Sequence, residues 1–193
     1  AGIAGLSAAI EAADNGAQVI VLDANSVGGG HAVKAGGLAM IDTQLQRSKG
    51  IKDSPKQAIA DILAWGEDAN QEWVERYAQD SSSEVYDWLV KLGVEFMLVL
   101  PTPESHVARF HFTKGTAVHV VLPMLHEALG RSNIVFLWQT GADALLSHEG
   151  RIIGVQVKNL RTGTPFNLYG NNVILATGGF QSNTDMVLEN WNR

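Results

Sequence analysis

The sequence predicts an α/β fold that combines a parallel central sheet, an inserted helical block and a small antiparallel β-meander. Three observations predict it. An alanine-rich helix and an apolar strand open the chain over 3–23, capping signals mark a series of helices over 54–93, and strand-like runs dominate after 133. We therefore divide 1–193 into three parts, 1–50, 51–132 and 133–193.

The opening helix is predicted over 3–15, where apolar residues recur at helical spacing. These residues are Leu6, Ala9, Ile10 and Ala13. Gly16 follows the helix, and the run "QVIVLD" at 18–23 has the length of a strand. Because this run is apolar on both faces, it is typical of a covered parallel sheet. A glycine-rich loop is expected over 24–37.

The helical block is predicted from its capping residues. The sequence "SPKQ" at 54–57 offers an N-cap serine, a proline at the first helical position and a capping-box partner, and its helix extends to Gly66. A second helix is expected over 71–80. Residues 81–84 offer another capping box, which predicts that a new helix begins there and continues over 85–93.

Large side chains of this block are interpreted as core packing residues, with an aromatic cofactor box as the alternative. They are Trp65, Trp73, Trp88 and Leu89. A strand over 94–100, a loop over 101–115 and a helix over 116–129 are expected next. Pro123 removes one backbone donor inside that helix, so we expect a kink there.

Four strand-like runs are found in the last part of the chain. They are 133–138, 151–159, 164–169 and 172–179. A turn at 161–163 predicts that the middle two form a hairpin.

Composition excludes several classes of protein and site. Hydrophobic residues make up 46% and charged residues 18%, as in globular proteins, and the net charge of -6 argues against a nucleic-acid-binding surface. The chain has no cysteine, which excludes disulfides, thiolate catalysis and cysteine zinc sites, and we expect no metal. No apolar run approaches the roughly 18 residues of a membrane span, so we expect no transmembrane segment and a cytoplasmic location.

The opening segment has the features of a Rossmann-type dinucleotide motif, in which the second and third glycines of G-x-G-x-x-G begin a helix beside a pyrophosphate. Gly2 and Gly5 fit these two positions. Asp23 closes the second strand, where an acid bonds the ribose, and it favours an unphosphorylated ribose. We expect the first glycine and its strand just before Ala1. An ordinary helix–turn–strand unit is the alternative.

Two further stretches, "GGGHAVKAGG" at 28–37 and "VILATGGF" at 173–180, complete a wider pattern with the opening motif. Together they resemble the flavoprotein family of soluble fumarate reductases, succinate dehydrogenase flavoprotein subunits and 3-ketosteroid dehydrogenases. The resemblance covers nearly the whole chain and includes "SPKQAIADIL", "VYDWLVKLGVEF" and "HVVLPML". It implies FAD as cofactor and a truncated FAD-binding domain.

The resemblance also implies which residues contact FAD. Those expected at the pyrophosphate, ribose and ribityl chain are Gly2, Ala4, Gly5, Asp23, Ala24, Gly28, Gly29, Gly30 and His31. Those expected near the isoalloxazine ring are Ala35, Gly36 and Gly37. Ala142 is expected at the adenine by a looser alignment, and Thr177, Gly178 and Gly179 end a strand against the cofactor.

His31 lies in the loop that carries a histidine linked covalently to the flavin in complex-bound relatives. Aligned on 36–37, it falls one residue past that position, which Gly30 occupies. We expect a polar contact between His31 and FAD, with covalent attachment or a solvated residue as alternatives. Lys34 offsets pyrophosphate charge or is simply exposed.

The remaining histidines carry weaker signals. His119 and His126 share a helix face and are expected to be structural, because no carboxylate completes a metal set. His106 and His111 fall in the predicted loop, from which they could approach substrate, and neither is assigned a role.

The resemblance implies hydride transfer between flavin N5 and a carbon next to an activating carbonyl, in an oxidoreductase acting on CH–CH bonds. The small-molecule substrate is a dicarboxylate or a ketosteroid. We assign no catalytic residue, because in this family the substrate and proton-donating groups come after the "ATGGF" strand, in a cap domain supplied by the rest of the polypeptide. We expect residues 1–193 alone to be inactive and to fold poorly or bind FAD weakly. A non-catalytic FAD-binding remnant and an NAD-dependent dehydrogenase are the alternatives.

Overall fold

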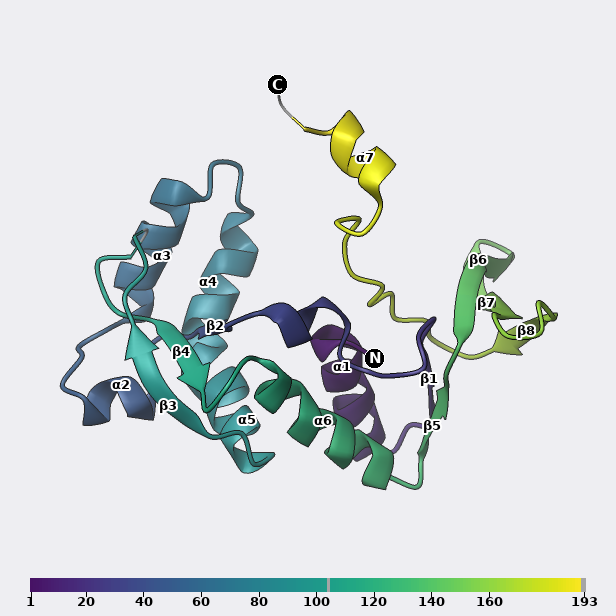
Figure 1. Ribbon diagram of the computed structural model, residues 1–193, viewed down its shortest axis with the longest axis horizontal. Helices are drawn as coiled ribbons and strands as arrows, with labels where there is room; N and C mark the ends of the chain where they lie inside the picture. Colours follow the sequence, from purple (N-terminus) through teal and green to yellow (C-terminus); the bar gives the residue numbers. More distant parts are fainter. Residues whose placement is uncertain (104, 192–193) are drawn as a thin grey trace. The chain divides into compact units, whose positions relative to one another are not determined.

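A computed structural model describes residues 1–103 and 105–191; Glu104, in the predicted loop, and the last two residues lie outside the described residues. The chain divides into two compact units, each described by itself. The first unit comprises 1–31 and the described residues from 128 onward, and the second unit comprises 32–127. Figure 1 gives the labels of the helices and strands.

In the first unit, helix α1 (Ile3–Asp14) is followed by strand β1 (Val19–Leu22), as predicted. Helix α1 buries the four residues expected from its spacing, Leu6, Ala9, Ile10 and Ala13. Strand β1 pairs in parallel with β5 (Ile134–Leu137). The predicted parallel sheet is therefore present as a two-stranded sheet among the described residues.

The antiparallel meander also belongs to the first unit. It joins β6 (Thr140–His148), β7 (Arg151–Asn159) and β8 (Pro165–Tyr169) in that order (Figure 1). The predicted hairpin is β7–β8, whose turn contains Gly163 at a positive φ of 74°. The sequence did not predict β6, because its residues alternate weakly between apolar and polar and only pairing with β7 defines the strand.

The strand predicted over 172–179 is absent, and that prediction was wrong for the structure described here. These residues belong to no strand, and none of the described strands pairs with them. Ile174 and Leu175 are both 66% exposed. An apolar run becomes a strand only where a neighbour bonds its backbone, so the composition of the run alone could not decide it. A short helix, α7 (Thr184–Glu189), follows.

The second unit is built around an antiparallel sheet with the order β2–β4–β3. Its strands are β2 (Gly37–Ala39), β3 (Phe96–Leu100) and β4 (Phe110–Thr113). Strand β3 matches the predicted run, whereas β4 lies inside the predicted loop. The 3₁₀ helix η1 (Gly30–Lys34) lies where the chain passes from the first unit to the second.

Helices make up most of the rest of the second unit. They are α2 (Gln44–Ser48), α3 (Pro55–Trp65), α4 (Gln71–Asp80), the π-helix η2 (Ser81–Asp87), α5 (Trp88–Lys91) and most of α6 (Val118–Gly130), whose last residues belong to the first unit. Figure 1 shows α3 and α4 side by side. Ala58 of α3 and Ala78 of α4 form a small buried cluster with Ile41. Pro123 lies inside α6, and the kink expected there stays a prediction.

Capping was predicted correctly at one position and wrongly at another. The Ser54 hydroxyl accepts the Gln57 N–H at 3.3 Å, but the Gln57 side chain bonds Asp61 instead of completing a capping box. No helix begins at Ser81, because α4 continues through η2 into α5. Ser81 is fully buried, and its hydroxyl accepts the backbone N–H of Ile41 at 2.9 Å.

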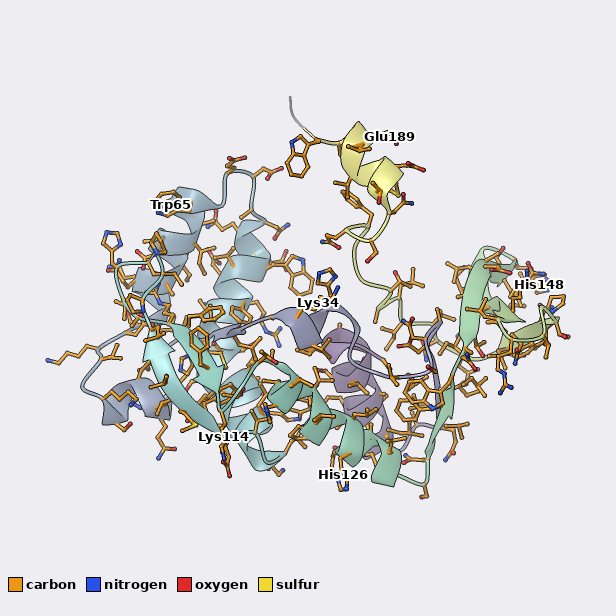
Figure 2. The ribbon with its side chains drawn as sticks, viewed as in Figure 1. Lys34, Trp65, Lys114, His126, His148 and Glu189 are labelled. Carbon is orange, nitrogen blue, oxygen red and sulfur yellow. The ribbon has the colours of Figure 1, made fainter. Side chains whose placement is uncertain are left out.

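The tryptophans of the helical block were assigned wrongly to the core. Trp65 is 63% exposed and Trp73 is 74% exposed, and Figure 2 shows Trp65 at the end of α3. Trp88 is half-buried, and Leu89 is buried as expected. Helix α4 instead buries the small residue Ala78, so burial here follows the facing surface and not side-chain size.

No helix in the described part of the chain is long and apolar enough to cross a bilayer. The cytoplasmic location stays a prediction.

Candidate functional site

The first residues of α1 provide an anion-binding helix end. Gly2 is the N-cap, contributes no side-chain cap, and has an extended backbone with φ -86° and ψ -177°. No acidic residue lies in the first turn. The leading N–H groups of a helix lack intrahelical partners and carry the positive end of its dipole. This end of α1 therefore suits a negatively charged group such as a pyrophosphate.

The glycine loop 28–30 lies directly beside Gly2. The two segments form an isolated parallel bridge between Gly2 and Gly29, and the Gly29 N–H donates to the Ala1 carbonyl oxygen at 2.7 Å. Gly30 has a φ of +55°, which an L side chain rarely adopts. Two of the glycine stretches predicted from the sequence are therefore adjacent within the first unit.

The third stretch reaches the same helix end. A Cβ placed on Gly5 would lie 3.5 Å from the Cβ of Ala176, one residue before Thr177. Gly178 follows with a φ of +77°. Segments numbered near 5, 29 and 176 thus meet around the first turn of α1.

Asp23 lies at the end of β1 with its carboxylate held close to this turn. One carboxylate oxygen accepts the Asn25 N–H at 2.8 Å, and the other lies 2.8 Å from the terminal ammonium nitrogen of Ala1, the residue before Gly2. The backbone of Asp23 is also fixed, because its carbonyl accepts the Thr140 N–H. The expected ribose-binding acid is therefore oriented beside Gly2, and Ala24 next to it is exposed.

The protein itself does not require glycine at position 2. A Cβ there would meet nothing closer than 3.8 Å, an ordinary van der Waals distance, and the φ of Gly2 is accessible to alanine. The missing side chain leaves open space at the helix end. A pyrophosphate of FAD fits that space and the unpaired helix donors. The carboxylate of Asp23 suits the hydroxyl groups of a ribose.

The loop predicted near the isoalloxazine ring, Ala35–Gly37, belongs to the second unit. Ala35 is exposed, Gly36 is half-buried and Gly37 is buried. A Cβ on Gly37 would lie only 2.0 Å from the His111 carbonyl oxygen, so the pairing of β2 with β4 requires glycine there. This close approach explains Gly37 without any ligand.

An aromatic pair on β4 packs against the same loop. The rings of Phe110 and Phe112 are 4.8 Å apart at 66°, and a Cβ on Gly36 would lie 3.2 Å from Phe112. Both phenylalanines are half-buried. No sequence motif indicates either of them.

The second unit contains a buried ionic cluster that sequence reasoning missed. We name it the Arg109 cluster, and its members are Arg109, Asp53, Asp61 and Gln46. Arg109 is 3% exposed and donates two hydrogen bonds to the carboxylate of Asp53, both at 2.8 Å, and one to Asp61 at 2.6 Å. Gln46 donates to Asp53 at 3.0 Å. Asp61 lies in the stretch "SPKQAIADIL", which carries part of the resemblance, but its partners are far away in number and nothing in the sequence joins them to it.

The carboxylates of the cluster stay ionised well into the acid range. Burial by itself raises the pKa of Asp61, but hydrogen bonds from Arg109, His106 and Gln57 outweigh it and lower that pKa to about 2. The pKa of Asp53 is lowered in the same way, against the effect of burial, mainly by its hydrogen bonds from Arg109 and Gln46.

The two histidines of the predicted loop have different surroundings. His106 is in a loop, with a side chain 78% exposed, and its Nδ1 lies 2.6 Å from an Asp61 oxygen. His111 is fully buried in β4, where its Nδ1 lies 2.5 Å from the Arg109 carbonyl and its Nε2 lies 2.7 Å from the Thr43 hydroxyl. Burial lowers the pKa of His111. The expectation that His111 lies in a loop was wrong.

Other predicted residues lie at the surface. His31, Lys34, Gly179, Thr177 and Ala142 are exposed, the last in β6 opposite Val157. His119 and His126 are also exposed, and both line a hollow of about 460 Å³ beside α6 together with Lys114 (Figure 2 labels His126 and Lys114). Among residues 1–103 and 105–191, no three His, Cys, Asp or Glu side chains form a group that could hold a metal ion.

Comparison with known proteins gives one family. Residues 1–192 match the model described as an FAD binding domain. A fumarate reductase (cytochrome) of Shewanella frigidimarina is 33% identical over 190 residues, which cover 96% of this chain and 33% of that protein. A KsdD-like steroid dehydrogenase of Mycobacterium tuberculosis is 29% identical over 229 residues, covering 100% of this chain and 40% of that protein.

The fold is similar to that of a solved flavoenzyme. The open conformation of a flavocytochrome c3 fumarate reductase superposes with a TM-score of 0.91 and 26% identity, over 98% of this chain and 34% of that chain. The chain thus spans about a third of the length of these fumarate reductases.

Proposed function

Because this chain belongs to the family of FAD-binding domains, we propose that the N-terminal end of α1 holds the pyrophosphate of FAD and that the loop 35–37 contributes to the isoalloxazine site. The proposal is supported by the glycines that meet at the first turn of α1 and by the carboxylate of Asp23, which the Asn25 N–H orients.

The proposed contacts are those expected from the sequence. In the first unit they are Gly2, Ala4, Gly5, Asp23, Ala24, Gly28, Gly29, Gly30, His31, Ala142, Thr177, Gly178 and Gly179. In the second unit they are Ala35, Gly36 and Gly37.

The proposed activity is that of an oxidoreductase acting on a CH–CH bond next to a carbonyl group. FAD, when bound, supplies hydride transfer at its N5 atom. The chain's residues bind and orient it. The fumarate reductase and steroid dehydrogenase relatives support a small-molecule substrate of dicarboxylate or ketosteroid type. A cap domain supplied by further polypeptide, which would bring the substrate-binding and proton-donating groups, belongs to the same proposal.

One observation carries the cofactor proposal: the fold has room for a side chain at Gly2, and the proposed pyrophosphate would occupy that room. The test is Gly2→Ala, with Gly130→Ala as control, because nothing lies within 4 Å of a Cβ at Gly130. We expect Gly2→Ala to change the free energy of unfolding by less than about 0.5 kcal/mol. FAD affinity, measured by quenching of flavin fluorescence, should fall by about tenfold or more, which corresponds to roughly 1.4 kcal/mol.

The control should bind FAD as the unmodified protein does. Equal FAD affinity for Gly2→Ala and the unmodified protein would show that Gly2 does not face the pyrophosphate. Turnover of fumarate or of a 3-ketosteroid with an artificial electron carrier, measured on the protein together with the proposed cap domain, then separates an enzyme from a non-catalytic FAD-binding protein.

A further inference from the structure

The Arg109 cluster has no role in the proposed function, yet its backbone is tied to the loop 35–37. The Arg109 carbonyl oxygen accepts the Met40 N–H at 3.0 Å, just after β2, and also contacts Nδ1 of His111. The guanidinium is fixed by Asp53 and Asp61, which belong to the segment before α3 and to α3 itself. Arg109, the residue just before β4, thus ties the start of this strand to the segment before α3 and to α3 itself.

Strand β4 transmits this anchoring to the loop. Gly37 pairs with Phe112, and Leu38 pairs with His111, whose ring is held by Thr43. Beyond β4, the Ala117 N–H donates to the Ala35 carbonyl oxygen at 2.9 Å. The loop is therefore bonded at both of its ends to the segment that Arg109 holds.

We infer that Arg109 is a positioning residue, which through β4 holds the loop 35–37 in the conformation that receives the flavin ring. The inference rests on the proposed FAD site. Asp53 and Asp61 fix the plane of the guanidinium, and Gln46 fixes Asp53.

Stability alone does not account for such a cluster. Removing ions from water costs several kcal/mol each, and well-packed apolar side chains of similar volume are often as stabilising as a buried ion pair or more so. Arg109 contributes orientation as well as charge. A planar guanidinium that is hydrogen-bonded to two carboxylates restricts the position of the Arg109 backbone.

The test uses Arg109→Lys, which keeps the charge and loses the planar fork. Asp61→Asn is a milder second variant, because it keeps the side-chain shape and leaves Arg109 paired with Asp53. The control is Ala78→Gly, which weakens the buried cluster that Ala78 of α4 forms with Ile41 and Ala58 but removes no hydrogen bond of the Arg109 cluster. Three quantities are measured for each: amide hydrogen exchange across the second unit without cofactor, affinity for FAD, and affinity for ADP, which lacks the flavin ring.

For both cluster variants we expect faster exchange of the amides of 35–40, while those of α4 keep their rates. If the loop is held correctly only a tenth of the time, the FAD dissociation constant rises about tenfold. ADP affinity should not change, because its contacts lie in the first unit. Ala78→Gly should speed exchange in α4 and leave FAD affinity within about twofold.

The outcomes separate the two proposals. Unchanged exchange of 35–40 in both cluster variants overturns the positioning role, whether or not FAD binds. Equal losses of FAD affinity in the cluster variants and in Ala78→Gly also overturn it, because general destabilisation then accounts for the effect. Failure of the unmodified protein to bind either FAD or ADP, when it is joined to the proposed cap domain, contradicts the proposed function instead.

Discussion

Glycine occupies different positions of this chain for different physical reasons, and the sequence does not distinguish these reasons. Gly2 and Gly37 both lie in glycine-rich stretches typical of flavin sites. A Cβ on Gly2 has room, whereas a Cβ on Gly37 would lie 2.0 Å from the His111 carbonyl oxygen. The space beside Gly2 is therefore available to a ligand, whereas strand pairing requires glycine at position 37.

We therefore expect Gly37→Ala to destabilise the second unit by about 3 kcal/mol, because backbone atoms of β4 must move to admit the methyl group. Urea unfolding followed by circular dichroism measures it. Gly130→Ala, where a Cβ meets nothing, serves as control. A loss below about 0.5 kcal/mol for Gly37→Ala would mean that β2 and β4 are not paired as described.

His111 illustrates the same limit for a titratable residue. The sequence predicts that His111 lies in a loop from which it could approach substrate. The structure instead buries His111 between Thr43 and the Arg109 carbonyl. Since a carbonyl can only accept, Nδ1 carries the proton and Nε2 accepts from the Thr43 hydroxyl. Burial lowers the pKa of His111, so the ring stays neutral.

At the scale of elements, local signals located the helices but did not always locate their ends. Ser54 and Pro55 begin α3 as predicted, because an N-cap acts on its own first turn. Ser81 and Glu84 have the same residue types, yet α4 continues through η2 into α5. Ser81 uses its hydroxyl for Ile41 instead, a residue 40 positions away.

Ser81→Ala is expected to cost about 1–3 kcal/mol of folding free energy, because it leaves the buried N–H of Ile41 without an acceptor. Ser83 is exposed on the same helical turn, and Ser83→Ala should stay within about 0.5 kcal/mol of the unmodified protein. Chemical denaturation of the two variants compares them directly. Similar losses for both would favour the capping role that the sequence predicted.

At the scale of the whole molecule, the described groups with strongly lowered acid pKa values belong to the second unit. Asp61 has a folded-state pKa of about 2 against an ordinary value of 3.8, and the pKa of Asp53 is lowered as well. A carboxyl whose pKa is lower in the folded state stabilises that state above its unfolded pKa and stops doing so as the pH falls toward the folded pKa. His111 acts in the same direction, starting near its unfolded pKa of 6.5.

The second unit should therefore lose stability as the pH falls from about 6.5 to 2, with Asp61 contributing roughly 2 kcal/mol of that loss below about pH 4. Hydrogen exchange at pH 7 and pH 4, corrected for intrinsic rates, compares the two units within one molecule. In Asp61→Asn, the stability of the second unit should change less with pH below pH 4. A stability that is flat over this range would contradict the ion pairs of the Arg109 cluster.

The sequence by itself determined the features that depend on neighbours along the chain. These are the face of α1 that is buried, the helix start at Ser54, the β7–β8 turn, and the glycine pattern that identifies the family. Periodicity, capping and turn chemistry act over a few residues, so they can be read from those residues.

Only the tertiary structure decided the features that depend on partners distant in sequence. It joined Arg109 to Asp53 and Asp61, buried His111, made β6 a strand, left 172–179 outside any strand among the described residues, and exposed Trp65 and Trp73. In each case a hydrogen-bond partner or a facing surface from elsewhere in the chain set the outcome, and no local pattern encodes which partner arrives.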